Sequence, residues 1–296
     1  QVKRMQQQQV DSIAVAFLFS FMNPSHEVLT REIIRELAPE IKVSISSQVL
    51  PKWGEFARTS TTVIDAYLKP ILKNYVTNLN NSRKELGIGR LQILQANGGA
   101  LTASSASENP ARLVKSGPAG GVIAASYIGK LTNQSHIIIA DMGGTSFETG
   151  FIPDCEPTFS SREELEYGIP IALNTIDVRS IGAGGGSLAY LDNAGIIRVG
   201  PQSAGSNPGP ACYNLGGTEP TITDANVALG RMVSEFPLGG YLQLNKDLAI
   251  KSLMPLAEKM GVSVPKLAQG IISIAVNNMA QAMRLVSVDC GHDPRN

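Results

Sequence analysis

The stretch HIIIADMGGTSFETGFI, residues 136–152, places a glycine-rich turn between two apolar segments. A short apolar run bounded by turn residues is typical of a buried strand, and HIIIA has that form. The turn DMGGTS (141–146) then combines a carboxylate, a glycine pair and two hydroxyls before the chain continues as FETGFI. The pattern predicts a strand, a turn and a second strand, with Asp141 at the end of a buried strand.

The composition of this turn suits a metal–nucleotide. Glycine lets the backbone approach a ligand closely, and converging backbone N–H groups bind anions. Thr145 and Ser146 add hydroxyl donors, while Asp141 can hold a Mg²⁺ that bridges to phosphate oxygens. A plain β-hairpin with a tight glycine turn explains the same residues. The turn taken alone leaves both interpretations open.

The residues around the turn alternate between strand and helix patterns, which predicts an α/β fold. Residues 13–19 read as a buried strand, 26–38 as a helix and 41–49 as an alternating strand, so a parallel βαβ unit is expected. A long helix is expected over 55–86, with Val63, Ile64, Tyr67 and Leu68 on one side. We place the only internal domain break near residues 49–55.

The second half of the chain is richer in short strands, loops and capped helices than the first. Residues 153–217 predict short strands and loops, because glycine and proline are dense there. Thr223 is expected to cap a helix that carries Asp224 in its first turn. Two further helices are expected over 246–260 and 264–288.

Two other segments are rich in glycine. SGPAGG (116–121) reads as a turn feeding a helix, where free N–H groups and the helix dipole could bind an anion, or where close packing requires glycine. It matches neither the Walker nor the dinucleotide pattern. GAGGGS (182–187) carries too few side chains for a core strand and is expected to fold against a ligand or another backbone.

Composition excludes several classes of protein. The chain has 25 basic and 25 acidic residues among 296, so its net charge argues against a protein built to coat nucleic acid or anionic membrane. Its longest apolar run, 13–19, is too short to span a bilayer. Three cysteines without a CxxC pair favour a reducing, cytoplasmic setting.

Two isolated residues leave alternatives open. Cys212 is either a nucleophile or a small buried thiol, and the second is favoured because no histidine is near it in sequence. His292 stands beside Asp293, and such a pair can share a metal or a proton.

Seven segments taken in order resemble one family: PKWGEFARTSTTVIDAYLKP, QANGGALT, SGPAGGVIAA, DMGGTSFETG, IGAGGGSLAY, VGPQSAGSNPGPACYNLGGTEPTITDANVALGR and GHDPR. That family is hydantoinase A/5-oxoprolinase, which includes ATP-dependent hydantoinases, 5-oxoprolinase and acetone carboxylase subunits. The resemblance runs from about residue 10 to the end. It implies an actin- or sugar-kinase-like ATPase fold with a ribonuclease-H-like sheet, glycine-rich loops and C-terminal helices.

The resemblance also implies an activity. Family members use ATP and Mg²⁺ to phosphorylate an amide carbonyl oxygen, and a hydantoinase B-type subunit or domain usually completes ring opening. We therefore expect part of an ATP-binding subunit, acting on a hydantoin or 5-oxoproline type of ring and assembling into an oligomer. Residues 1–52 would end an N-terminal lobe and 53–296 would form the central domain. A non-catalytic scaffold and a ketone carboxylase subunit are the alternatives.

The site residues follow from the resemblance position by position. Asp141 and Thr145 would be catalytic, and Asp141 and Glu148 would hold the metal. The cofactor-binding residues would be Gly143, Gly144, Ser146, Gly117, Gly120, Gly121, Gly184, Gly185 and Gly186. Phe147 and Glu148 stand where the family pattern continues with Thr-Asp. The family's first D-x-G-G-T-x-T-D turn is not in this sequence, so we expect an excerpt of a longer polypeptide with a partial nucleotide site.

Overall fold

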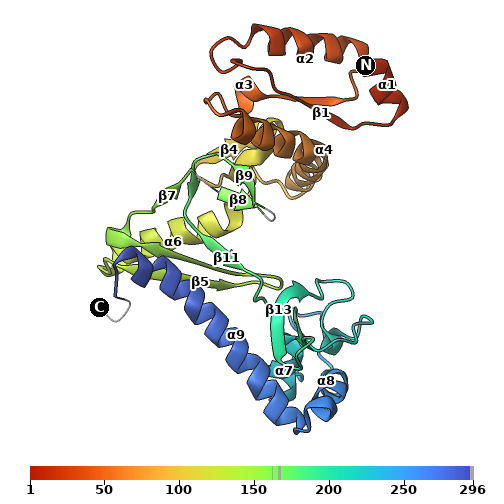
Figure 1. Cartoon of the computed structure of the whole chain (residues 1–296), viewed down its shortest axis with the longest axis vertical. Helices are drawn as coiled ribbons and strands as arrows, with labels where there is room; N and C mark the ends of the chain where they lie inside the picture. The colour runs from red at the N-terminus through yellow and green to blue at the C-terminus, as the bar shows by residue number, and fades with distance from the viewer. Residues whose placement is uncertain (162, 166–167, 294–296) are drawn as a thin grey trace. The chain divides into compact units, whose positions relative to one another are not determined.

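The computed structural model describes residues 1–161, 163–165 and 168–293 of a mixed α/β chain (Figure 1). The chain divides into two compact units. Unit 1 comprises residues 1–128 and 156–177, and unit 2 comprises residues 129–155 and 178–296. Each unit is described by itself below.

Unit 1 opens with the expected βαβ unit. Helix α1 (Val2–Gln7) comes first. Strands β1 (Ser12–Val15) and β2 (Lys42–Ile45) then pair in parallel and are connected by helix α2 (Ser25–Leu37), as predicted. Both strands are shorter than the apolar patterns suggested. β1 ends at Val15, and β2 gives way to a short helix, α3 (Ser46–Val49).

The early end of β2 has a tertiary cause. The Ser46 hydroxyl donates to Glu27 Oε1 at 2.7 Å, and the Ser47 N–H donates to Glu27 Oε2 at 2.8 Å. Glu27 is fully buried, so its carboxylate must be satisfied by donors from the protein. These hydrogen bonds require a turn after Ile45, where local alternation alone predicted more strand.

The long helix α4 (Glu55–Glu85) forms as expected and keeps Pro70 inside it. The apolar side is not the buried side: Val63 is 51% exposed and Tyr67 is 70% exposed, while Ile64 and Leu68 are half-buried. The buried side carries Arg58, Thr61, Thr62, Asp65, Ala66, Lys69 and Val76. Packing against polar groups from β2 therefore overrides the hydrophobic pattern in this helix.

The rest of unit 1 consists of short elements. β3 (Gln92–Leu94) and β4 (Ala100–Thr102) form an antiparallel hairpin, followed by α5 (Ala103–Glu108), η1 (Pro110–Leu113) and α6 (Ser116–Thr132), whose last turn belongs to unit 2. Later residues add two antiparallel pairs, β7 (Phe159–Ser160) with β10 (Thr175–Ile176) and β8 (Glu163–Leu165) with β9 (Ile169–Ile171).

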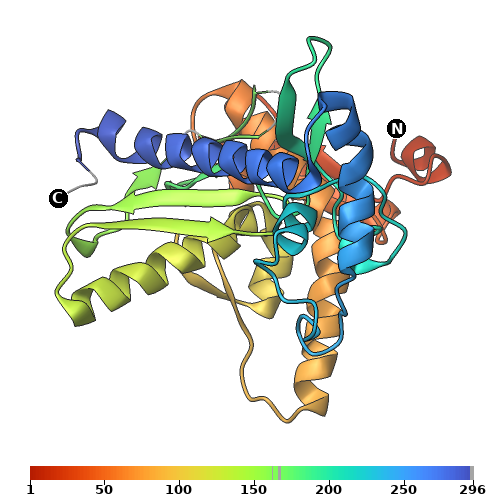
Figure 2. The same cartoon turned by 90° about the horizontal axis from the view of Figure 1, so that it is seen from below.

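Unit 2 is built on an antiparallel sheet in the order β11–β6–β5, formed by β11 (Arg179–Ile181), β6 (Phe147–Ile152) and β5 (Ile137–Met142). Helix α9 (Val264–Val286) lies along this sheet (Figures 1 and 2). Phe147 is buried between the sheet and α9 with Ala183 and Ala282. β5 was expected to be buried, but residues 140–142 are exposed because β5 is an edge strand with β6 as its neighbour.

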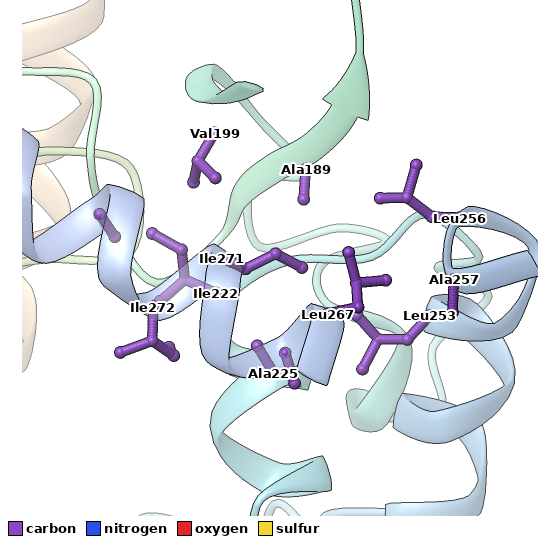
Figure 3. Packing of buried hydrophobic residues seen from close by; sticks show 12 residues of the cluster. Ala189, Val199, Ile222, Ala225, Leu253, Leu256, Ala257, Leu267, Ile271 and Ile272 are labelled. Carbon is purple, nitrogen blue, oxygen red and sulfur yellow. The ribbon is translucent and has the colours of Figure 1, made fainter. Parts of the chain in front are cut away.

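The second part of unit 2 holds an aliphatic core. The hairpin β12 (Ser187–Leu191) and β13 (Ile197–Ser203) packs with α7 (Ile222–Ala228), α8 (Lys246–Met260) and α9. Figure 3 shows Leu253, Leu267 and Ile271 converging with the smaller Ala225. Short 3-10 turns complete the unit: η2 (Pro153–Cys155), η4 (Ala211–Tyr213) and η5 (Val288–Cys290).

Helices α8 and α9 confirm the two sequence predictions closely. The cap of α7 lies two residues before the predicted position. Thr221, and not Thr223, is the N-cap, and it forms a reciprocal capping box with Asp224. By length and composition alone, α9 with the residues after it (Val264–Cys290) could cross a membrane. Leu267, Ile271 and other residues of this helix nevertheless lie in the unit 2 core.

Candidate functional site

The DMGGTS segment is the turn of a β-hairpin. β5 and β6 pair in register from Ile137↔Ile152 to Met142↔Phe147, which leaves residues 143–146 as the connection. The Gly143 N–H closes the turn by donating to the Ser146 carbonyl at 2.9 Å. Gly143, Gly144 and Thr145 are exposed. The hairpin interpretation is therefore right for the backbone, and the exposed turn remains open to a ligand.

The GAGGGS segment folds directly against this turn. The Gly185 N–H donates to the Gly143 carbonyl at 2.9 Å, and the Gly186 N–H donates to the Gly144 carbonyl at 2.7 Å. A Cβ added at Gly184 would lie 2.5 Å from the Ser146 nitrogen, a separation that real Cβ atoms do not show. Glycine is required at position 184 because two backbones meet there.

The loop is held in turn by the start of α7. Both the N–H and the hydroxyl of Thr223 donate to the Gly185 carbonyl, at 2.8 Å and 2.9 Å. A Cβ at Gly185 would lie 2.9 Å from the Thr223 hydroxyl oxygen. Turn, loop and helix therefore form one hydrogen-bonded stack that fixes the position of the DMGGTS backbone.

This stack leaves donors available in the turn. The carbonyls of Gly143 and Gly144 are occupied by the GAGGGS loop. The N–H groups of Gly144, Thr145 and Ser146 donate no hydrogen bond to any residue that the structure describes. Backbone N–H groups in a glycine turn are suitable ligands for phosphate oxygens. The turn thus fits the phosphate groups of a nucleotide.

Two carboxylates flank the turn on one face of the sheet. Asp141 and Glu148 are directly opposite each other on β5 and β6, and Ser180 on β11 is opposite Glu148. Glu148 Oε1 accepts hydrogen bonds from the hydroxyls of Ser146 at 2.5 Å and Ser180 at 3.1 Å. Directly opposed cross-strand side chains lie within contact distance. The sheet therefore places the two predicted metal ligands next to each other.

The pair suits a Mg²⁺ that arrives with a nucleotide. No group of three metal-ligating side chains occurs among the described residues. Mg²⁺ usually takes one or two protein carboxylates and completes its shell with water and phosphate oxygens. Asp141 is exposed and Glu148 is half-buried, so both could contribute to such a site. The residues fit a nucleotide-bound Mg²⁺ and not a closed protein metal cage.

Phe147 does not lie on the face of the sheet that carries Asp141 and Glu148. Successive side chains of a strand point to opposite faces, so Phe147 and Glu148 lie on different sides of β6. Phe147 is 4% exposed and packs in the cluster with Ala183 and Ala282. The departure from the family pattern at position 147 is therefore a change in the core of unit 2.

The SGPAGG segment differs from its predicted form. Gly117, Gly120 and Gly121 lie within α6, which begins at Ser116, and not in a turn that precedes the helix. A Cβ at Gly120 would lie 2.9 Å from Leu94 Cδ2 of β3, whereas Gly117 and Gly121 have open space. Close packing explains Gly120. The role of these three glycines in cofactor binding stays a prediction.

Cys212 and His292 lie outside the stack of turn, loop and helix. Cys212 is fully buried, and burial, followed by the neighbouring Asp224 carboxylate, raises the pKa of its thiol well above the usual range. The ring of His292 lies 4.3 Å from that of Phe151. Phe151 pairs with Ile138, at the end of the hairpin opposite to the turn.

Asp224 has an evident structural role. Its carboxylate accepts hydrogen bonds from the N–H groups of Ala211, Cys212 and Thr221, at 3.2 Å, 2.8 Å and 3.0 Å. It therefore ties the proline-rich loop to the start of α7. Sequence reasoning missed Thr223 and Ser180 as supports of the site. The sequence does contain a signal for Thr223: Thr221 and Asp224, three residues apart, form a capping box. Recognising Thr221 as the cap would have left the Thr223 side chain available for another role.

Family models match most of the chain. A model described as hydantoinase/oxoprolinase matches residues 58–296, and one described as hydantoinase/oxoprolinase N-terminal region matches residues 1–38. The domain boundary predicted near residue 52 is not tested by these matches and stays a prediction.

Similar proteins include enzymes of two kinds. The caprolactamase subunit alpha of Pseudomonas jessenii is 39% identical over 98% of this chain and 42% of its own length. The 5-oxoprolinase of Saccharomyces cerevisiae is 35% identical over 96% of this chain and 22% of its own length. A nucleotide-free acetone carboxylase structure superposes with a TM-score of 0.89 and 28% identity, over 99% of this chain and 42% of that chain. The chain thus spans less than half the length of these relatives.

Proposed function

Because this chain belongs to the hydantoinase/oxoprolinase family, we propose that it is part of the ATP-binding subunit of an enzyme that hydrolyses a cyclic amide. The observation that carries the proposal is the braced DMGGTS turn, with three free N–H groups beside Asp141 and Glu148. Caprolactamase and 5-oxoprolinase among the relatives support an amide substrate.

In the proposed reaction the cofactor would supply the phosphoryl group, and the residues of this chain would bind and position it. When bound, Mg-ATP would supply the phosphoryl group that converts the ring carbonyl into a better electrophile. The N–H groups of residues 144–146 would bind phosphate oxygens, and preorganised donors of this kind stabilise the charge that develops in phosphoryl transfer. Asp141 and Glu148 would hold the metal or its waters. The GAGGGS loop and Thr223 would keep the turn in place without touching the nucleotide.

The remaining parts of the proposal concern the whole protein. A hydantoinase B-type subunit or domain would complete ring opening, and the relative named caprolactamase subunit alpha supports a multi-subunit assembly. We also propose a cytoplasmic, reducing compartment, because Cys155, Cys212 and Cys290 form no disulfide within the described residues.

The test is Mg-ATP binding by calorimetry to the full-length natural polypeptide. Asp141→Asn should weaken binding at least about 100-fold, because the variant removes the carboxylate that holds the metal. Asp154→Asn is the matched control, since Asp154 is another exposed aspartate of unit 2 and follows the far end of the hairpin. Unchanged binding in Asp141→Asn would contradict the proposal.

A ketone carboxylase subunit is the second candidate, and the high structural similarity to acetone carboxylase favours it. ATP hydrolysis by the full-length protein with its partner subunit separates the two candidates. Stimulation by lactams without bicarbonate would support the amidase. Stimulation only by ketones together with bicarbonate would support the carboxylase.

A further inference from the structure

A pocket of about 420 Å³ lies in unit 1, lined by the last turns of α4, the segment after it, the β3–β4 hairpin and the start of α5. At roughly 30 Å³ per water molecule it has space for about fourteen waters, which is enough for a small organic ion. All of the lining lies within residues 80–104, so unit 1 forms the pocket alone. The DMGGTS turn belongs to unit 2, and none of its residues lines the pocket.

The polar side chains of this pocket include two arginines. Arg83 is half-buried and Arg90 is exposed, and neither guanidinium forms an ion pair with a residue that the structure describes. No acidic residue is among the described residues that line the pocket. The other polar side chains in the lining are Asn80, Gln92, Thr102 and Ser104. The pocket therefore carries two positive charges that no carboxylate of the described chain neutralises.

Arg83 is held in place by the backbone that follows it. Its Nη1 donates to the Ile88 carbonyl at 2.9 Å and also to the Gly89 carbonyl. Its Nε is buried and out of reach of a ligand. Its Nη2, in contrast, is not buried and donates to no residue of the described chain. The guanidinium is thus anchored through Nη1, and Nη2 is left to donate to a ligand oxygen.

The two hydroxyls of the pocket leave a second donor. Thr102 Oγ1 and Ser104 Oγ lie 3.1 Å apart and share one hydrogen bond, and both residues are exposed. Each hydroxyl has one proton, so one of the two O–H groups stays available to a ligand. The side-chain amides of Asn80 and Gln92 add N–H donors to the same lining.

The carbonyl end of α4 does not oppose an anion here. The carbonyls of residues 82–84 accept hydrogen bonds from the N–H groups of residues 86–88, at 3.0 to 3.2 Å. The carbonyls of Ile88 and Gly89 accept from Arg83. These backbone acceptors are therefore occupied, and the groups that stay available are mainly donors and cations.

A small organic dianion complements this set of groups. Guanidinium groups form strong charge-assisted hydrogen bonds with phosphate and carboxylate oxygens. A phosphate monoester carries a charge of about −1.5 to −2 at pH 7 and offers three acceptor oxygens, and a dicarboxylate has a similar charge. We propose that this pocket binds a small organic dianion, with Arg83 Nη2 and Arg90 pairing with its charged oxygens and the free hydroxyl of Thr102 or Ser104 donating to another oxygen. The proposal stands independently of the proposed function, since no residue of the DMGGTS turn takes part.

The test is calorimetric binding of two dianions to the full-length natural polypeptide, without ATP or metal. The probes are glycerol 3-phosphate and succinate, and glycerol and succinamide are their neutral counterparts. At least one dianion should bind saturably and about 100-fold more tightly than its neutral counterpart, because two charge-assisted hydrogen bonds are lost in the latter. Its binding should weaken as salt is added, since the arginines are accessible to solvent. The tighter probe identifies the ligand as a phosphate monoester or a dicarboxylate.

Two variants assign that binding to the pocket. Arg90→Gln should weaken dianion binding about 10-fold or more, because it removes one charge-assisted contact from an exposed side chain. Arg83→Gln should weaken it at least as much, and the double variant should abolish it. Arg35→Gln is the matched control, since Arg35 is an exposed arginine of unit 1 outside the pocket. Thermal melting identifies any variant that has lost its fold.

Three outcomes would overturn the proposal. They are the absence of saturable dianion binding, binding that Arg90→Gln leaves unchanged, and an equal loss in Arg35→Gln, which would indicate a general attraction to positive charge. Binding that requires Arg90 and Arg83 but not Arg35 would support it. Mg-ATP binding and its dependence on Asp141 are measured separately, so either result leaves the proposed function to its own test.

Discussion

Helices α4 and α9 are the longest helices described in their units, and they bury opposite kinds of side chain. α9 buries an aliphatic face: Leu267, Ala268, Ile271, Ile272, Ala275 and Ala282. α4 buries mostly polar and charged residues, and it exposes Val63, Tyr67, Ile71 and Tyr75. The comparison shows that the apolar side of the helix is the buried side in α9 but not in α4.

The two interiors also depend on different interactions. The Asp65 carboxylate accepts from the Ser44 hydroxyl at 2.6 Å and from the Ala111 N–H at 3.1 Å, and it lies 3.5 Å from Lys69 Nζ. Removing one partner of such a group leaves the others buried and unsatisfied. The α9 interface has no comparable requirement, because shape and volume determine its stability.

The largest effect is expected from Asp65→Ala, which should destabilise unit 1 by about 3–5 kcal/mol, since the buried Lys69 would keep only the exposed Glu108 carboxylate, 4.0 Å away, as a charge partner. Chemical denaturation combined with hydrogen exchange in α4 measures it. Glu85→Ala, at the exposed end of the same helix, is the control and should change stability by less than about 0.5 kcal/mol. A loss below about 1 kcal/mol in Asp65→Ala would mean that the polar interior adds little.

Ile271→Ala should destabilise unit 2 by about 2–5 kcal/mol, because it removes a fully buried side chain and leaves a cavity. The same denaturation experiment, with hydrogen exchange followed in α9, measures the loss. Val276→Ala is the matched control, since Val276 is on α9 and 56% exposed. Equal effects at positions 271 and 276 would refute the assignment of the buried face.

Low pH should destabilise unit 1 before it destabilises unit 2. Burial would raise the pKa of Glu27, but hydrogen bonds from Ser46, Ser47 and Phe17 outweigh it and lower the pKa below 4.5. The stabilisation is therefore present above the unfolded-state pKa and is lost as pH falls through the lower, folded-state pKa.

Hydrogen exchange between pH 7 and pH 3 should show protection lost in α2 and β2 before it is lost in the aliphatic cluster around α9, which contains no titratable residue. Glu27→Gln should reduce this difference in pH dependence. Simultaneous loss of protection in both regions would count against the role of Glu27.

The smallest effect is expected on the exposed side of α4. Tyr67→Ser should change the free energy of unfolding by less than about 0.5 kcal/mol in this chain, because Tyr67 is 70% exposed. Chemical denaturation of the 296-residue chain measures the change. A loss above about 1 kcal/mol in the 296-residue chain would show that the apolar side of α4 is packed after all.

Much of the candidate site could be anticipated from local sequence. The order strand, turn, strand over residues 136–152 follows from two apolar runs around a glycine pair, and the structure confirms it. The helical start of α6 was missed because glycine and proline in SGPAGG resemble a turn. Proline is well suited to a helix's first turn, and Gly120 is accommodated by contact with Leu94.

The amino-acid sequence by itself determined the elements whose stabilising contacts are local or periodic: the parallel βαβ unit, the DMGGTS hairpin, and helices α8 and α9. Its ordered motifs also identified the family. Only the tertiary structure decided that GAGGGS braces the DMGGTS turn and that α4 buries its charged side. These features depend on hydrogen bonds between residues far apart in the chain, such as Gly185 to Gly143 and Asp65 to Ala111, and no local pattern encodes them.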